Sequence, residues 1–278
     1  MAVLLALAAA IAYGLSDFLG GVGSRRTSVW PVATAAAVAS AVGSLVLALV
    51  VPGDAGPADY AWGALAGLGS GAGTVLLYRG FAQGRMGVVA PVSAVGAAVL
   101  PGLIGVLAGE RPAPLVWVGL LVALPGIWLV SREPVPGQRR DGVAAGLRDG
   151  VLAGLGFGLL FAALGQVPES AGYGPVLGNQ VVALLAVVAA ALLAGADPLP
   201  RRLQHWWGGA AGLLATLAIV GFLLARQQGL LSVSAVLTSL YPAATIVLAS
   251  VVLHERLHRA QSVGLALCGV SVVCVALG

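Results

Sequence analysis

Charged residues are scarce in this chain of 278 residues: they make up 9%, whereas roughly 25% is usual in soluble domains. Lysine is absent, so all 14 basic residues are arginines, against ten acidic residues. Hydrophobic residues make up 59%. This composition excludes an ordinary soluble domain and predicts a multi-pass protein of the cell (plasma or inner) membrane. Arginine-only usage beside abundant alanine, glycine and valine is typical of codon bias, so the net charge of +4 predicts no nucleic-acid partner.

Nucleophilic and metal-binding residues are also rare. Cys268 and Cys274, the two cysteines, lie too far apart around one helix to pair, and we expect them to be inert packing residues. The sequence contains no glycine-rich phosphate loop of the Walker type. Its three histidines lie at the ends of apolar stretches or in loops, where they complete no Ser-His-acid triad. We therefore expect no cofactor, no bound metal and no ATP hydrolysis.

Apolar stretches near the length of about 20 residues that crosses a membrane as a helix are abundant. The first lacks the basic start of a signal peptide, so we interpret it as a retained span. All six tryptophans lie at or near stretch ends, where such rings prefer the headgroup layer. The sequence predicts an all-α membrane protein with ten transmembrane helices, at 3–22, 31–51, 61–78, 88–108, 115–131, 150–165, 175–195, 207–225, 232–252 and 262–277.

The chain repeats itself at an offset of 145 residues. The matched positions include rare residue types, as in Trp62-Gly63 with Trp207-Gly208 and Glu110-Arg111 with Glu255-Arg256. We therefore predict two five-span repeats, 1–131 and 150–278, joined by a charged loop at 132–149. An odd number of spans makes the second repeat enter from the opposite face. Inverted repeats of this kind are typical of secondary transporters.

The arginines are unevenly divided between the two sides of the membrane. Twelve lie in the connections after odd-numbered spans, and only Arg111 and Arg226 lie on the other side. Because arginine near span ends favours the cytoplasm, this count predicts that both termini face outward.

Asp17 is the one acidic residue well inside a predicted span. A charge at such depth costs roughly 2.5 to 3.5 kcal/mol and normally faces a bundle interior or an aqueous cavity. Its repeat counterpart is Ala162, so the symmetry is broken here. We predict a proton-coupling site or a counter-ion for a cationic substrate, with Tyr13 and Ser16 as hydrogen-bonding neighbours. The alternative is a side chain that reaches the membrane surface or pairs with Arg25.

Other polar residues within the spans are weaker candidates. Asn179 and Gln180 are adjacent, so their side chains point about 100° apart and at most one squarely faces a cavity. Hydrogen bonding between helices, at about 0.6 kcal/mol, is the alternative. Neutral groups that could add to the cavity are Ser93, Thr238, Ser239 and Tyr241.

Two kinds of small or rigid residue predict how the helices pack and bend. Glycines every fourth residue in three spans predict close helix packing, at Gly63, Gly67 and Gly71, at Gly154 and Gly158, and at Gly208 and Gly212. Prolines in the two spans that the repeat aligns predict bends or breaks suited to gating, at Pro91, Pro101 and Pro242.

The stretch His254-Glu255-Arg256-Leu257-His258 matches H-E-x-x-H, which on a helix provides two zinc ligands and a general base. It raises the alternative of an intramembrane metalloprotease. Against this, the repeat equivalent Gly109–Ala113 has no histidine, and no third ligand is evident in a span.

Several short stretches carry a resemblance to a known family: Tyr13-Gly14, Pro91-Val92-Ser93-Ala94 to Pro101, Gly109-Glu110-Arg111-Pro112, and Tyr241-Pro242 followed by Glu255-Arg256. In this order within two repeats, they resemble the drug/metabolite transporter superfamily in its EamA-type ten-span form. The resemblance implies a small-molecule carrier whose cavity is lined mainly by spans 1, 3, 4, 6, 8 and 9, with spans 5 and 10 peripheral. It also implies cytoplasmic termini, opposite to the arginine count.

The expected function is secondary transport of a small organic metabolite, amino-acid-like, drug-like or a related amphiphile, by alternating access. Export is expected because the resemblance is mostly to exporters. The alternatives are a proton-coupled importer of a small cation or sugar, which Asp17 would suit, and a flippase for a lipid-linked precursor. The expected partners are the substrate, the bilayer and protons, and the expected assembly is a monomer or homodimer.

Overall fold

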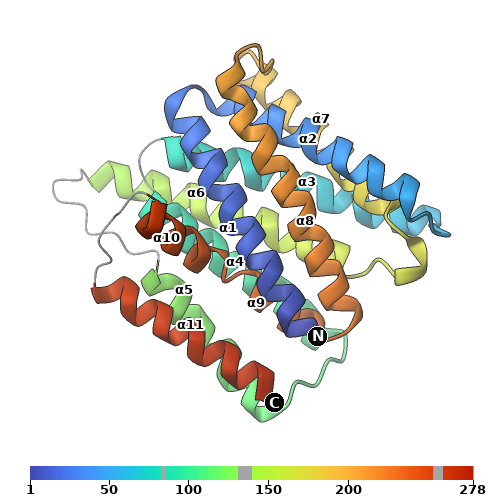
Figure 1. Ribbon diagram of the computed structural model, residues 1–278, viewed down its shortest axis with the longest axis vertical. Helices are drawn as coiled ribbons and strands as arrows, with labels where there is room; N and C mark the ends of the chain where they lie inside the picture. The colour runs from blue at the N-terminus through green and yellow to red at the C-terminus, as the bar shows by residue number, and fades with distance from the viewer. Residues whose placement is uncertain (83–85, 131–139, 253–258, 278) are drawn as a thin grey trace.

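The computed structural model describes residues 1–82, 86–130, 140–252 and 259–277, and the regular structure in these ranges is helical (Figure 1). The all-α prediction is confirmed. The long helices are α1 (Ala2–Arg26), α2 (Val29–Val50), α3 (Pro57–Ala82), α4 (Met86–Leu107), α5 (Pro114–Val130), α6 (Arg140–Leu164), α7 (Gly174–Leu193), α8 (Trp207–Gln227), α9 (Leu231–Thr238), α10 (Tyr241–Val252) and α11 (Arg259–Leu277), with short 3-10 turns η1 (Glu169–Ala171) and η2 (Leu203–Trp206).

The helices follow the predicted spans, with two differences. The span predicted at 232–252 is divided into α9 and α10 by a turn at Ser239 and Leu240. Pro242 explains this break, because it has no N–H for the carbonyl four residues earlier and its ring clashes with that carbonyl. The second difference is that α6 begins at Arg140, so residues 140–149 of the predicted loop are helical. Residues 131–139 lie outside the described ranges.

The prolines of the fourth span behave differently from Pro242. Pro91 and Pro101 both lie within α4, which continues without interruption over Met86–Leu107. Of the two predicted effects, a break is absent at these two positions, and a bend stays a prediction. Packing against α6 along the helix accounts for this, because tertiary contacts can hold a helix together across a missing hydrogen bond.

Packing between helices follows the sequence repeat. Helix α1 packs on α8, and their repeat counterparts α6 and α3 pack on each other. In the same way, the contact of α4 with α6 corresponds to the contact of α1 with α9 and α10. The contact of α3 with α7 corresponds to the contact of α2 with α8. Three further contacts, α2 with α7, α4 with α9 and α5 with α11, each join a helix to its own counterpart. The structure is thus two five-span halves related by an approximate twofold axis, as expected for inverted repeats.

Glycines bring the helix backbones of the two halves into direct contact. A methyl group at Gly67 would overlap the carbonyl oxygen of Asn179 on α7, and one at Gly212 would overlap that of Ala36 on α2. Ser40 on α2 adds a hydrogen bond, donating to the carbonyl of Gly212 at 2.7 Å. The prediction that these glycines pack helices closely is confirmed.

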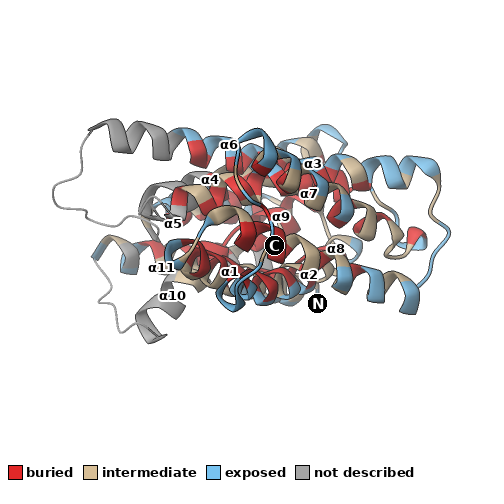
Figure 2. Cartoon of the chain, turned by 90° about the horizontal axis from the view of Figure 1, so that it is seen from above, coloured by how far each residue is buried: buried red, intermediate tan, exposed pale blue. Residues whose placement is uncertain are grey.

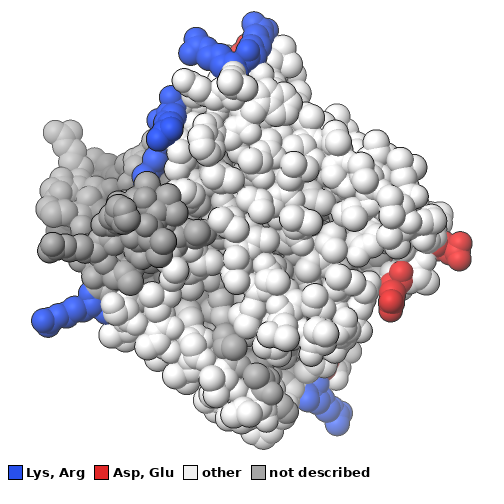
Figure 3. Space-filling model, in the orientation of Figure 1, with Lys and Arg blue, Asp and Glu red and all other residues white. Residues whose placement is uncertain are grey.

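The outer surface of the bundle is apolar, and its charges lie at the ends of helices. Leucines on several helices are largely exposed, including Leu4, Leu49 and Leu193, whereas the buried residues lie inside the bundle (Figure 2). In the face shown in Figure 3, arginines and carboxylates are confined to the rim around a broad uncharged area. By length and composition, four described helices could cross a membrane: Ala2–Arg26, Val29–Val50, Gly174–Leu193 and Leu203–Gln227.

Candidate functional site

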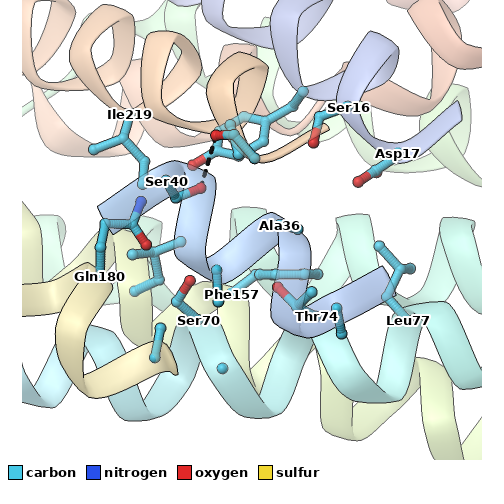
Figure 4. Close-up of a pocket in the computed structure, with 18 of the residues that line it drawn as sticks. Ser16, Asp17, Ala36, Ser40, Ser70, Thr74, Leu77, Phe157, Gln180 and Ile219 are labelled. Atoms are coloured by element: carbon cyan, nitrogen blue, oxygen red, sulfur yellow. Dashed lines mark hydrogen bonds between the residues drawn. The ribbon is translucent and has the colours of Figure 1, made fainter. Parts of the chain in front are cut away.

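A small cavity lies between the two halves, where α1, α2 and α3 of the first meet α6, α7, α8 and α10 of the second (Figure 4). Its volume is about 60 Å³. Small-molecule pockets usually measure about 300–1,000 Å³, so the cavity has room for only a few water molecules. The helices are therefore closed around the site in this structure.

Asp17 lies in the wall of this cavity, with its carboxylate directed into it (Figure 4). Asp17 is only 8% exposed. Helix α1 continues beyond Asp17 to Arg26. Within the part of the chain that the structure describes, Asp17 forms no ion pair and accepts no hydrogen bond. This position differs from the alternative in which Asp17 reaches the membrane surface or pairs with Arg25.

The neighbours expected around Asp17 are present, but their hydroxyl groups differ in their hydrogen bonds. Ser16 lines the cavity and donates to the carbonyl of Ala211 at 2.8 Å, which joins α1 to α8. Tyr13 lies one turn before Asp17 and also lines the cavity. Its buried hydroxyl has no hydrogen-bond partner among the described residues. The tyrosine is therefore a free polar group beside the carboxylate.

Tyr241 brings the second half of the chain to the same cavity. Its hydroxyl lies 2.9 Å from the Ser93 hydroxyl, so a hydrogen bond joins α10 to α4 and fixes the ring. Ser93 is fully buried behind Tyr241 and does not line the cavity. The break before α10 places Tyr241 at the first residue of that helix.

Two predicted residues are not at the cavity. Asn179 and Ser239 are fully buried, and their side-chain polar atoms have no partner among the described residues. Neither lines the cavity, whereas Gln180 does (Figure 4). The prediction that Asn179 lines the cavity is therefore wrong, and the adjacent Gln180 lines it instead. Because the two side chains point about 100° apart, the rotation of α7 decides between them.

Sequence reasoning missed a polar row on α3. Ser70 and Thr74 face Asp17 across the cavity in Figure 4, and Tyr78 follows one turn later. These residues recur every four positions, the spacing that places side chains on one helix face. This periodicity is visible in the sequence and could have identified them.

The comparisons with known proteins agree with this architecture. The EamA-like transporter family matches residues 1–132 and 145–277, which correspond to the two halves. The chain belongs to the EamA-like transporter family. A solved crystal structure, titled only as that of a protein, superposes with a TM-score of 0.73 at 16% identity, covering 99% of this chain and 96% of that chain. The comparison with curated proteins gives no match.

Membership identifies the chain as a multi-pass membrane transporter of small substrates. The cavity of this EamA-like transporter differs in one respect from what the resemblance implied. Helices α2 and α7 contribute lining residues, and the described residues of α4 contribute none. Helices α5 and α11 pack on each other away from the cavity, as implied. The glycine contacts explain why α2 and α7 line the cavity. Glycines of α8 allow α2 to pack closely on that helix, and glycines of α3 allow α7 to do the same.

The remaining predicted positions are the prolines and the histidine motif. Pro101 and Pro242 are buried and do not line it, so a role in gating remains a prediction for both, as it does for Pro91. His254–His258, the possible zinc motif, lies outside the described residues but inside the second segment that matches the transporter family. Among the described residues, no group of three or more His, Cys, Asp or Glu side chains could hold a metal ion.

Polar contacts join helices at opposite ends of this transporter. At one end, Arg79 of α3 donates two hydrogen bonds to the buried Asp149 of α6, at 2.5 and 3.0 Å. At the other end, Glu110 follows α4 and its carboxylate accepts the backbone N–H groups of Leu231 and Ser232, at 2.5 and 3.0 Å. The Ser232 hydroxyl donates to it as well, at 2.7 Å. Each contact links the first half to the second.

Proposed function

We propose that this protein is a secondary transporter that exports a small organic metabolite by alternating access around the cavity of Asp17. The observation that carries the proposal is a closed cavity between two inverted halves. Among the described residues that line it, the one charged side chain, Asp17, is buried and forms no ion pair with another described residue. An uncompensated charge in this environment is costly, so the carboxylate is suited to exchanging a proton or binding a cation.

Alternating access is supported by the symmetry of the packing. The cavity lies between halves whose helix contacts occur in equivalent pairs, so two arrangements of similar energy can open it to opposite sides. The polar contacts of Arg79 and Glu110 hold the halves together at opposite ends of the bundle. A substrate larger than a few waters requires one end to separate.

Accessibility of the cavity from each side of the membrane tests this proposal. Ser70 is replaced by cysteine in a chain that also carries Cys268→Ala and Cys274→Ala, and the protein is reconstituted in vesicles of known orientation. A membrane-impermeant thiol reagent is then added on one side at a time. We expect Ser70→Cys to react from both sides, because the cavity opens to each in turn.

The matched control is Ala66→Cys, one turn earlier on α3, where the residue is fully buried and does not line the cavity. We expect this cysteine to remain unmodified. Labelling of Ser70→Cys from one side only would contradict alternating access. Steady ion current through the reconstituted protein would instead indicate a channel.

The direction of transport needs a separate measurement. Efflux from cells that is driven by an inward proton gradient, or uptake into inverted vesicles with an acidic lumen, supports export with Asp17 as the coupling group. Accumulation of a small cation or sugar in the direction of that gradient would support the alternative of proton-coupled import. Asp17 fits both directions, so only the sign of the flux separates them.

A further inference from the structure

The charge in the cavity favours one sign of ligand. Asp17 is the only charged side chain among the described residues that line it. The other polar groups that line it are neutral: hydroxyl groups of serine, threonine and tyrosine, and the side-chain amide of Gln180. An anion would meet the carboxylate without a compensating cation, and a zwitterion would leave its own carboxylate unpaired. The cavity is therefore complementary to a ligand with net positive charge.

Aromatic rings line the same cavity as this charge. Tyr13, Tyr78, Phe157, Phe161 and Tyr241 all line the cavity. The ring of Tyr13 lies 5.8 Å from that of Phe161, in an edge-on arrangement, and 6.4 Å from that of Tyr241. Aromatic faces attract cations, most strongly where water is excluded.

Inorganic ions fit the lining less well than organic ones. Hard cations such as Ca²⁺ and Mg²⁺ take about six to eight oxygen ligands, many of them carboxylates. Here a single carboxylate stands among aromatic rings, alanines and aliphatic side chains. Such a wall instead offers dispersion contacts and cation-attracting faces to an alkyl or aryl group that carries the charge.

We propose that the cavity selects organic ammonium ions, with Asp17 as the counter-ion and the aromatic side chains around it as the cage for the cationic head. This inference rests on the proposed transport function and names its substrate class. The volume of about 60 Å³ accommodates a small ammonium head, and the apolar body occupies space that opens when the halves separate. Tyr13 provides the free hydroxyl group beside the head.

Three probes of one shape and different charge test the inference: benzylammonium, benzyl alcohol and benzoate. Binding to the purified full-length protein is measured by calorimetry in a mild detergent, with sodium chloride titrated separately. We expect wild-type protein to bind benzylammonium at least about tenfold more tightly than benzyl alcohol, and benzoate not at all. In Asp17→Asn, this preference should fall to within about twofold.

Two further variants show that the change is specific. Asp54→Asn makes the same substitution at an exposed carboxylate outside the cavity and should keep the preference. Asp17→Glu keeps the charge and should retain most of it, which guards against a variant that fails to fold. Equal affinity for benzyl alcohol, tight binding of benzoate, sodium binding that competes with benzylammonium at equal strength, or an unchanged preference in Asp17→Asn would each overturn the inference.

Transport measurements with the same probes separate this inference from the proposed function. Selective binding of benzylammonium without movement across proteoliposomes supports the site and contradicts the transporter. Transport of benzyl alcohol at the rate of benzylammonium supports the transporter and contradicts the cation selectivity.

Discussion

Replacement of Glu110 should destabilise the second half of the protein although the residue belongs to the first. The N–H groups at the start of a helix have no partner within it, and Glu110 supplies one for Leu231 and Ser232 at the start of α9. Both residues are buried, so water cannot easily replace the carboxylate. Gly109 places Glu110 there by adopting a φ of 98°, a conformation open to glycine.

The size of the effect follows from these contacts. A hydrogen bond to a charged group contributes about 1.5–3 kcal/mol, and an anion at a helix N-terminus about 0.3–1 kcal/mol. Because Glu110 is partly exposed, solvent weakens these contacts. We therefore expect Glu110→Ala to lower the free energy of unfolding by about 2 kcal/mol. For a chain of this size that corresponds to about 4–8 °C in Tm. Glu110→Gln retains one acceptor oxygen and should lose about half as much.

Thermal unfolding of the purified protein, followed by tryptophan fluorescence, measures this effect. Glu169→Ala provides the matched control, because Glu169 is exposed in a short turn and should change Tm by less than about 1 °C. Glu110→Ala with a wild-type Tm would refute the argument that the carboxylate holds α9. An equal loss in Glu169→Ala would show that net charge, rather than the contact, is responsible.

Three other predictions concern packing, charge and orientation. Gly212→Leu should lower Tm by many degrees or prevent folding, because the leucine side chain would overlap the α2 backbone. Gly102→Ala is the control and should change Tm little, because the space around Gly102 is open. Thermal unfolding of both variants measures the difference. Arg79→Leu leaves the buried Asp149 with only Arg148, 3.8 Å away, as an ion-pair partner and should cost about 2 kcal/mol. Asp149→Leu in the same chain should restore much of this loss, and without that rescue the Arg79–Asp149 pair is not the cause. In a cysteine-free background, Ala2→Cys should react with a membrane-impermeant thiol reagent added outside the cell, because the arginine count predicts outward-facing termini. If the cysteine does not react with this reagent, the termini lie in the cytoplasm, as the family resemblance implies.

The sequence was sufficient for the architecture because its signals are strong. Membrane-spanning lengths and the offset of 145 residues do not depend on how any helix is rotated. The same holds for Asp17, since a charge at this depth must face the protein interior whatever the packing. Tyr13 and Ser16 followed from their proximity to it along one helix.

Rotation of the helices was the part that the sequence could not supply. In a membrane both the lipid-facing and the buried sides of a helix are apolar, so the usual amphipathic pattern is weak. Asn179 and Gln180 illustrate the difficulty, because either could face the cavity until the glycine contacts between α3 and α7 fix the register. The break after Thr238 and the unbroken α4 likewise depend on tertiary packing, which determines whether a proline bends or interrupts a helix.

The most direct test of the central claim is gradient-driven transport by Asp17→Asn in proteoliposomes. Benzylammonium flux is measured with and without an imposed proton gradient, for wild-type protein, Asp17→Asn and Asp54→Asn. We predict that the gradient accelerates flux in wild-type and Asp54→Asn protein, and that Asp17→Asn loses this acceleration and its dependence on pH. Unaltered flux and unaltered pH dependence in folded Asp17→Asn would contradict this prediction.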